Sequence, residues 1–347
     1  TTNAALSPTA VTGLSSGIPT TGAGRIAAGA NHTCAVVGSA LKCWGLNTFQ
    51  QSDTVPTSPV LTPPGTPRIA SGVSAVSAGG AHTCALVGTT LQCFGRNASG
   101  QLGKGYNAVA ASALAAAPLT DGVAAIASGS LHACALRGGQ VLCWGYNANG
   151  QLGNGSFANA AAPVPVSGIA SGATAVATGA AHSCAIVNGG VKCWGNNANG
   201  QLGNNSTGSS LTPGDVILTA PATLLANVTA IAAGTSHTCA VATYTGITRV
   251  YCWGANNTGQ VGDNSTTTPR TVATQTTGAS TSGAVAVAAG NNHTCAITNG
   301  DALKCWGSNS AGQLGTAAVG NTLQAAFAGG LLSGVTALAA GNGHTCA

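Results

Sequence analysis

Residues 126–156 read IASGSLHACALRGGQVLCWGYNANGQLGNGS, and residues 176–206 read VATGAAHSCAIVNGGVKCWGNNANGQLGNNS. Each segment has a His-x-Cys run, a Gly-containing turn, a Cys-Trp-Gly run and a Gly-Gln-Leu-Gly loop. The cysteines of the His-x-Cys runs follow one another at intervals of 50, 50, 50, 55, 56 and 51 residues. A period near 50 with Gly-rich turns predicts the blades of a β-propeller rather than a helical solenoid. All seven histidines stand in this motif: His32, His82, His132, His182, His237, His293 and His344.

The pattern G-x-x-H-T-C-A-L … C-W-G-x-N-x-x-G-Q-L-G resembles the regulator-of-chromosome-condensation repeat, from about Ile26 to Ala347. The resemblance implies an all-β fold of the bacterial-type secreted kind: a seven-bladed β-propeller with four-stranded blades and an N-terminal strand that closes the ring. Residues 1–347 then form a single domain. In it, residues 1–25 supply the closing strand or outer segment, and repeats start near residues 26, 76, 126, 176, 231, 287 and 337. Members of the family share the fold and not the activity.

The cysteine spacing indicates a disulfide within each hairpin. If Gly38 and Ser39 form the turn of the hairpin at residues 32–45, Cys34 and Cys43 face each other at a pair without backbone hydrogen bonds. The Cα separation there is about 4.5 Å, which suits a disulfide. Six disulfides would indicate an oxidising compartment and leave Cys346 as an unpaired or intermolecular thiol. The predicted pairs are Cys34–Cys43, Cys84–Cys93, Cys134–Cys143, Cys184–Cys193, Cys239–Cys252 and Cys295–Cys305.

A metal site is the alternative interpretation of the His-x-Cys motif. The motif and the facing Cys offer three ligands rather than four, and zinc-type C-x-x-C spacing is missing. We therefore predict disulfides, no metal and no cofactor, with structural histidines that bond to the backbone near the preceding Gly. The aromatic residues next to the second Cys should pack between blades rather than form a ligand site. They are Trp44, Phe94, Trp144, Trp194, Trp253 and Trp306.

The composition argues against several classes of function. The chain has five acidic residues, all Asp, which leaves few candidates for a paired-carboxylate site, so we expect no enzyme and no catalytic residues. The ten basic residues are scattered, which disfavours nucleic-acid binding despite a net charge of +5. No apolar run is long enough for a membrane span. Because the chain contains no Met, we expect a removed signal peptide and an extracellular or cell-surface location.

The last repeat is incomplete in the sequence. It begins at Val335 as VTALAAGNGHTCA and contains no Cys-Trp-Gly run, while residues 6–14 resemble the Pro-containing outer segment of the other repeats. We expect residues 6–14 to close the ring beside it, with one strand missing between them. Two explanations are open: further chain beyond Ala347, which we favour, or a strand supplied by another chain through β-augmentation.

Three functions follow as hypotheses. The first is a non-enzymatic extracellular structural protein, a self-assembling cell-surface or fibre subunit, because charge on the chain is sparse. The alternative is a secreted protein- or glycan-binding module or inhibitor that uses one propeller face. Nucleotide exchange on a small GTPase is disfavoured, since disulfides contradict a nuclear or cytosolic setting. Among several Asn-x-Ser/Thr sequons, Asn205 and Asn264 lie in predicted loops and are the candidate glycan sites.

Overall fold

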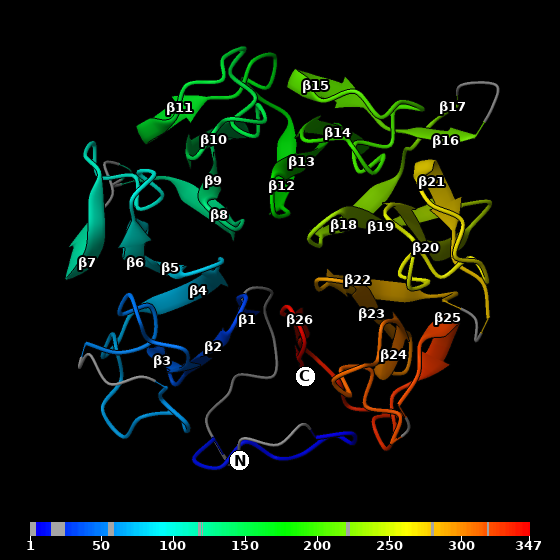
Figure 1. The fold of residues 1–347 in the computed structure, drawn as a ribbon, viewed down its shortest axis with the longest axis horizontal. Coiled ribbons are helices and arrows are strands. Elements are labelled where there is room, and N and C mark those ends of the chain that lie inside the picture. Colours follow the sequence, from blue (N-terminus) through cyan, green and yellow to red (C-terminus); the bar gives the residue numbers. More distant parts are fainter. Residues whose placement is uncertain are drawn as a thin grey trace.

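The computed structural model describes residues 5–14, 25–54, 59–116, 119, 121–219, 223–278, 281–317 and 319–347, and here the chain is built from β-strands. Antiparallel sheets radiate around a central channel, and the strands of each sheet follow chain order from the axis outwards (Figure 1). Within these residues, no helix has the length and apolar character needed to span a bilayer. The repeat therefore forms blades, as its period predicts.

Six blade sheets make up most of the ring. The first blade contains β1 (Ile26–Ala28), β2 (His32–Val37) and β3 (Ala40–Gly45). The second contains β4 (Val73–Ala78), β5 (His82–Val87), β6 (Thr90–Asn97) and β7 (Ala108–Ala116). The third contains β8 (Val123–Ser128), β9 (His132–Arg137), β10 (Gln140–Gly145) and β11 (Ala160–Pro165).

The other half of the ring repeats this plan. The fourth blade contains β12 (Ala173–Thr178), β13 (His182–Val187), β14 (Gly190–Gly195) and β15 (Ser210–Asp215). The fifth contains β18 (Val228–Ala233), β19 (His237–Tyr244), β20 (Ile247–Gly254) and β21 (Arg270–Gln275). The sixth contains β22 (Ala284–Ala289), β23 (His293–Thr298), β24 (Ala302–Gly307) and β25 (Thr322–Phe327). A small ribbon, β16 (Ile217–Thr219) with β17 (Thr223–Leu224), joins the fourth to the fifth.

The prediction of seven four-stranded blades is wrong. The described residues form six blade sheets, one with three strands and five with four. The seventh repeat forms only the two-stranded sheet of β26 (Ala339–Ala340) and β27 (Thr345–Cys346), which we call the closing hairpin. This repeat has no Cys-Trp-Gly run that could pair with β27. In the first blade, the described residues that follow β3 make two isolated bridges to it, from Val60 and Ile69, and Pro63, Pro64 and Pro67 interrupt the segment between these two residues.

The hairpins have the predicted register. Cys34 lies opposite Cys43, and both turn residues, Gly38 and Ser39, have positive φ values of 56° and 69°. Positive φ at both positions is typical of the tight turn whose twist matches two antiparallel strands. The six disulfides expected from the cysteine spacing are present, with Cα–Cα separations of 4.0 to 4.1 Å. Each one joins two neighbouring strands of a single blade.

Blades pack with the disulfide face of one against the aromatic face of the next. Cys134 and Cys143 of the third blade share a buried cluster with Ala185 and Trp194 of the fourth. Four other junctions repeat this arrangement, so the predicted packing between blades is confirmed for Phe94, Trp144, Trp194, Trp253 and Trp306. Full burial of one such side chain contributes roughly 1.5–3 kcal/mol. Trp44 differs from the other four Trp side chains, because it is only half-buried.

The blades meet at the axis through a ring of glycines. A Cβ added to Gly29 would lie 2.4 Å from the carbonyl oxygen of Gly79, and a Cβ on Gly341 would lie 2.5 Å from that of Gly29. No side chain fits between these backbones, so the position requires Gly. The closing hairpin supplies the last member of the ring, which therefore closes around a channel of about 80 Å³. The ring consists of Gly29, Gly79, Gly129, Gly179, Gly234, Gly290 and Gly341.

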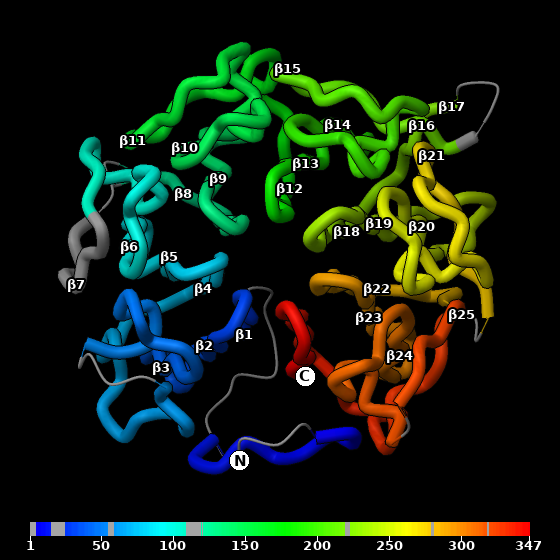
Figure 2. Tube along the Cα trace, viewed as in Figure 1, coloured from blue at the N-terminus to red at the C-terminus, as the bar shows by residue number. Residues whose placement is uncertain are grey.

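The N-terminal segment, residues 5–14, runs between the first and sixth blades (Figure 2). The amide of Ala317 donates a hydrogen bond to the carbonyl oxygen of Leu6 at 2.9 Å, as the amide of Asn264 does to Leu323 in the neighbouring outer strand, at 3.0 Å. The segment thus takes the place of an outer strand. None of its described residues pairs with β27, from which the sequence predicts it to be separated by one missing strand.

Candidate functional site

The repeated histidines cross-link neighbouring blades. The Nε2 of His132 lies 2.9 Å from the hydroxyl of Ser183 in the next blade. That hydroxyl donates its single proton to the carbonyl oxygen of Gln151, at 2.9 Å. Nε2 must therefore carry the proton and donate to Ser183, which assigns the neutral Nε2–H tautomer to His132.

Six junctions have this His–hydroxyl pair, including the one that closes the ring between His344 and Thr33 at 2.9 Å. The sequence-based expectation that these side chains bond to backbone near the preceding Gly is wrong, because Nε2 contacts a hydroxyl, while the ring only packs on that Gly. The hydroxyl partner was missed, although the Thr or Ser after most of the histidines was a visible signal. The other pairs are His32–Thr83, His182–Thr238, His237–Thr294 and His293–Thr345.

Burial lowers the pKa of these imidazoles well below the usual 6.5. The pKa falls to about 3 at His32, His132 and His237, where neighbouring histidines oppose protonation further. It falls to about 4 at His82, His182 and His293, again chiefly through burial. A second proton on Nδ1 would have no acceptor among the described residues. These six histidines therefore remain neutral across the physiological range of pH.

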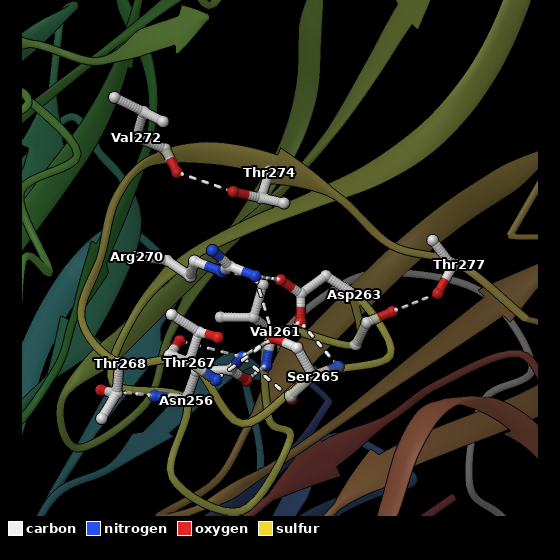
Figure 3. Close-up of polar contacts among 11 residues, drawn as sticks. Asn256, Val261, Asp263, Ser265, Thr267, Thr268, Arg270, Val272, Thr274 and Thr277 are labelled. Carbon is white, nitrogen blue, oxygen red and sulfur yellow. Dashed lines mark hydrogen bonds and ion pairs between the residues drawn. The ribbon is translucent and has the colours of Figure 1, made fainter.

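The most enclosed acidic side chain belongs to Asp263, on the loop between β20 and β21 (Figure 3). Arg270 donates its Nε–H to Oδ2 at 2.7 Å and also forms an ion pair through Nη2. Oδ1 accepts hydrogen bonds from Asn256 Nδ2 at 3.0 Å and from the Ser265 hydroxyl at 2.9 Å. With both oxygens occupied by neighbouring protein groups, the cluster holds the loop in place and presents no free carboxylate to a ligand.

The two candidate glycan sites lie at the surface. Asn205 and Asn264 are exposed and adopt positive φ values of 58° and 62°, as Asn tolerates in tight turns. Asn205 accepts a hydrogen bond from the Thr271 hydroxyl at 3.3 Å. Their exposure leaves both available to a modifying enzyme, and glycosylation at either position stays a prediction. Among the residues described, no group of three His, Cys, Asp or Glu side chains is arranged to hold a metal ion.

Cys346 is the free thiol of the described chain, and it lies half-buried on β27. Burial raises the pKa of its thiol, and a hydrogen bond with Thr33 opposes the rise. The thiol lines a cavity of about 1210 Å³ between the closing hairpin, the N-terminal segment and the first and sixth blades. This cavity has both apolar and polar walls. It is the candidate site for a partner.

Several solved structures share this fold. Human WBSCR16 is similar with a TM-score of 0.77 and 22% identity, over 92% of this chain and 84% of that chain. Prp20p from Saccharomyces cerevisiae has a TM-score of 0.76 and 21% identity, over 91% of this chain and 80% of that chain. Yeast RCC1 (Prp20) bound to Kap60 has a TM-score of 0.73 and 20% identity, over 87% of this chain and 74% of that chain. At these identities the likeness concerns the fold alone. No curated protein sequence matches the chain at a significant level.

The repeat itself identifies the family. One model of the regulator of chromosome condensation (RCC1) repeat matches residues 138–186, 188–241 and 249–297. A second model of the same repeat matches residues 123–151, 173–201 and 284–313. Together the matches extend over most of residues 123–313, which is more than half of the chain. The chain belongs to the regulator of chromosome condensation repeat family.

Proposed function

We propose that this protein is a non-enzymatic, extracellular protein-binding propeller. The observation that carries the proposal is a ring of blades, each held by its own hairpin disulfide, which presents the loops between its strands to a partner. Six disulfides support an oxidising location.

The similar structures give the proposal limited further support. Prp20p has binding properties towards Gsp1p and histones, and the yeast protein has also been solved bound to Kap60. Those propellers bind proteins, and binding of this chain to a protein is consistent with the shared fold. The non-enzymatic part rests on the side chains: the histidines and Asp263 are engaged in structural contacts.

The test starts from the protein in its natural source, treated with an alkylating agent during isolation so that free thiols are trapped. We expect it outside the cell, in a complex with another polypeptide, and we expect Cys346→Ser to change that complex while the six hairpin disulfides persist. Mass spectrometry of cross-linked peptides would locate the contact. A cytosolic protein, or a monodisperse monomer with alkylated Cys346 and no associated polypeptide, would overturn the proposal.

A self-assembling surface or fibre subunit is the second candidate. It is favoured by sparse charge, fifteen charged side chains in 347 residues, together with exposed apolar side chains such as Leu61, Phe157 and Val319. Low charge and exposed apolar groups both promote association between copies. Negative-stain electron microscopy of the native protein separates the candidates, because ordered fibres or sheets support assembly and discrete particles support the binding module.

A further inference from the structure

We propose that the loop end of the third and fourth blades binds a neutral glycan, a chain of β-linked glucose residues. Two loops form the site: residues 146–159, between β10 and β11, and residues 196–209, between β14 and β15. We call them the amide loops, because Asn is their most frequent residue. They belong to neighbouring blades of the ring (Figure 1). The inference goes beyond the proposed function, since the ligand is a glycan and not a protein.

The amide loops contain no Asp, Glu, Lys or Arg. Residues 121–216 contain four charged side chains, and these lie at the opposite end of the two blades, where the hairpin turns are. They are already paired with one another, Arg137 with Asp121 at 2.9 Å and Lys192 with Asp215 at 2.7 Å. An ionised ligand would lose its hydration at the amide loops without meeting a counter-charge on either loop. This segregation of charge favours an uncharged, polar ligand.

An amide bridge joins the two loops across the junction of the blades. Asn196 donates from Nδ2 to Oδ1 of Asn149, at 3.1 Å. The Oδ1 of Asn196 accepts from Gln201 Nε2 at 2.9 Å and from the amide of Ala198 at 3.2 Å. Gln201 is buried, and its Oε1 accepts from the amide of Asn199 at 2.8 Å. The bridge is therefore held in place before a ligand arrives, which lowers the entropic cost of binding.

The bridge keeps hydrogen-bonding groups for a ligand. A side-chain amide has two N–H donors and an oxygen with two lone pairs. Within the described part of the chain, the Nδ2 of Asn149 has no acceptor, and it is not fully buried. Asn196 uses one of its two N–H groups, in the bridge itself. The remaining donors and the second lone pair on Oδ1 of Asn149 suit the neighbouring hydroxyls of a sugar, which both donate and accept.

The loops leave the bridge open to solvent. Ala148 and Ala198 occupy the same place in the two loops, and both are exposed. Their methyl groups are too short to fold over the bridge. Tyr146 begins the third-blade loop and is half-buried, so an aromatic ring with a hydroxyl group stands beside the opening.

A second aromatic ring stands at the other end of the third-blade loop. Phe157 is 61% exposed, so most of its apolar surface faces water. The turn that carries it is fixed by Asn147, whose Nδ2 donates to the carbonyl oxygens of Ser156 at 2.8 Å and Ala158 at 2.9 Å. Asn147 lies two residues before Asn149, so the ring and the amide bridge are parts of one braced loop. An exposed ring on a fixed turn is a platform for an apolar face of a ligand.

The repeat needs neither of these elements to build a blade. At the next junction, Asn199 and Ala255 occupy the places of the bridged amides, and a methyl group cannot form the bridge. Thr207 occupies the place of the exposed ring in the fourth blade. The third and fourth blades nevertheless have the same four-stranded order and the same hairpin disulfide. Bridge and ring occur together at one junction, which indicates a local site rather than a requirement of the fold.

A chain of β-linked glucose matches both elements. All hydroxyl groups of this sugar ring are equatorial, so its two faces carry C–H groups and its rim carries the hydroxyls. A C–H face can stack on Phe157, while rim hydroxyls of another sugar in the chain form hydrogen bonds with the amide bridge. The ligand is therefore an oligosaccharide, because one sugar ring cannot contact both elements.

Isothermal titration calorimetry of the 347-residue chain, with its disulfides formed, tests the site. The probe is cellohexaose, a neutral chain of six β-linked glucose residues. We expect saturable one-to-one binding that is the same at low and high salt, because no charge takes part. The same oligomer with a carboxylate on each sugar should bind about tenfold more weakly. No saturable binding of cellohexaose, checked also by saturation-transfer NMR, overturns the proposal, as does tighter binding of the carboxylate oligomer.

Variants locate the site on the ring. Phe157→Ala should weaken the binding of cellohexaose about tenfold, and Asn149→Ala about fivefold. Phe327→Ala and Asn299→Ala are the matched controls, because they make the same changes at exposed residues outside the amide loops. They should bind like the parent, and the Tm of each variant shows that it is folded. Parent-like binding by both site variants would overturn the proposal, and the proposed binding of a protein partner would be unaffected.

Discussion

His82 meets no hydroxyl in the next blade, because Ala133 occupies there the place that Ser183 holds in the fourth blade, and each lies opposite the Trp of its hairpin. Both ring nitrogens of His82 lack a hydrogen-bond partner among the described residues. At the junction between the third and fourth blades, His132 forms a hydrogen bond with the Ser183 hydroxyl, which in turn donates one to the carbonyl oxygen of Gln151. The junction between the second and third blades therefore lacks the His–hydroxyl hydrogen bond that the other six junctions have.

Replacement of Ala133 by Ser should stabilise the protein. The new hydroxyl can accept a hydrogen bond from His82 and donate one to the carbonyl oxygen of Gln101. That oxygen already accepts a hydrogen bond from the indole N–H of Trp144, at 2.9 Å. A recovered buried hydrogen bond contributes about 0.5–1.5 kcal/mol. Urea unfolding without reductant measures the gain. Ser183→Ala is the matched control and should lose about 1–3 kcal/mol, since it leaves His132 unpaired. An Ala133→Ser protein less stable than the parent contradicts the expected hydrogen bond.

Stability should fall as the pH is lowered from 6.5 towards 4. In the unfolded chain the histidines bind a proton near pH 6.5, whereas in the folded protein their pKa is about 3 to 4. The unfolded state thus binds more protons below pH 6.5, at about 1.4 kcal/mol per pH unit for each histidine. The stabilisation is complete above pH 6.5 and is lost as the pH approaches the pKa values that the histidines have in the folded protein. Tm measured by circular dichroism from pH 8 to 4 should decline steeply; a flat profile would refute the assignment.

The glycine ring should not accept a methyl group. In Gly129→Ala, the new Cβ would lie 2.4 Å from the carbonyl oxygen of Gly179 and from Cε1 of His132, so the blades must separate. Overpacking of this kind costs about 1–3 kcal/mol. Gly208→Ala is the control, because its nearest neighbour is the Ser206 hydroxyl at 3.5 Å, and its stability should match that of the parent. Equal unfolding midpoints for the two variants would show that the ring can relax.

The ion pair of Asp263 and Arg270 should couple more strongly than the exposed pair of Asp121 and Arg137. Asp263 has a side-chain exposure of 5%, against 71% for Asp121. Exposed pairs contribute about 0–1 kcal/mol, whereas loss of one partner of a buried hydrogen-bonded charge costs more. Double-mutant cycles with Asp→Asn and Arg→Ser changes at each pair measure the coupling. The double variant Asp263→Asn, Arg270→Ser should be more stable than either single variant. The fourth blade has Asn204 and Ser210 at the two equivalent positions, so this pair of side chains fits the loop without charge. Equal coupling energies would contradict the prediction.

Much of the blade could be predicted from local spacing. The separation of nine positions from Cys34 to Cys43 specifies the turn length and the facing of the two cysteines, and the alternation of Cys43 and Trp44 specifies opposite faces; the structure has both. The blade count came from the family resemblance and was wrong, because only part of the last repeat forms a sheet. The role of Thr83 depends on contact with a histidine 51 residues away, so the recurring Thr or Ser after the histidines marks the position but not its partner.

The candidate site was harder to predict for a related reason. That Cys346 has no partner follows from counting cysteines, and the sequence raised the possibility of a strand from another chain. The cavity depends on how the N-terminal segment lies relative to β27, and the hydrogen bond from Thr345 to Gln313 joins residues 32 positions apart. These are properties of the closed ring, which no single repeat encodes.

Every disulfide lies inside one hairpin and spans 9 to 13 residues. No covalent bond other than the backbone therefore joins one blade to another in the described chain. A protease cut in a connection between blades would leave two fragments that stay together only through packing and the histidine links. In denaturant without reductant those fragments would come apart, while each hairpin kept its own short covalent loop. In covalent terms the ring is a linear string of small closed loops.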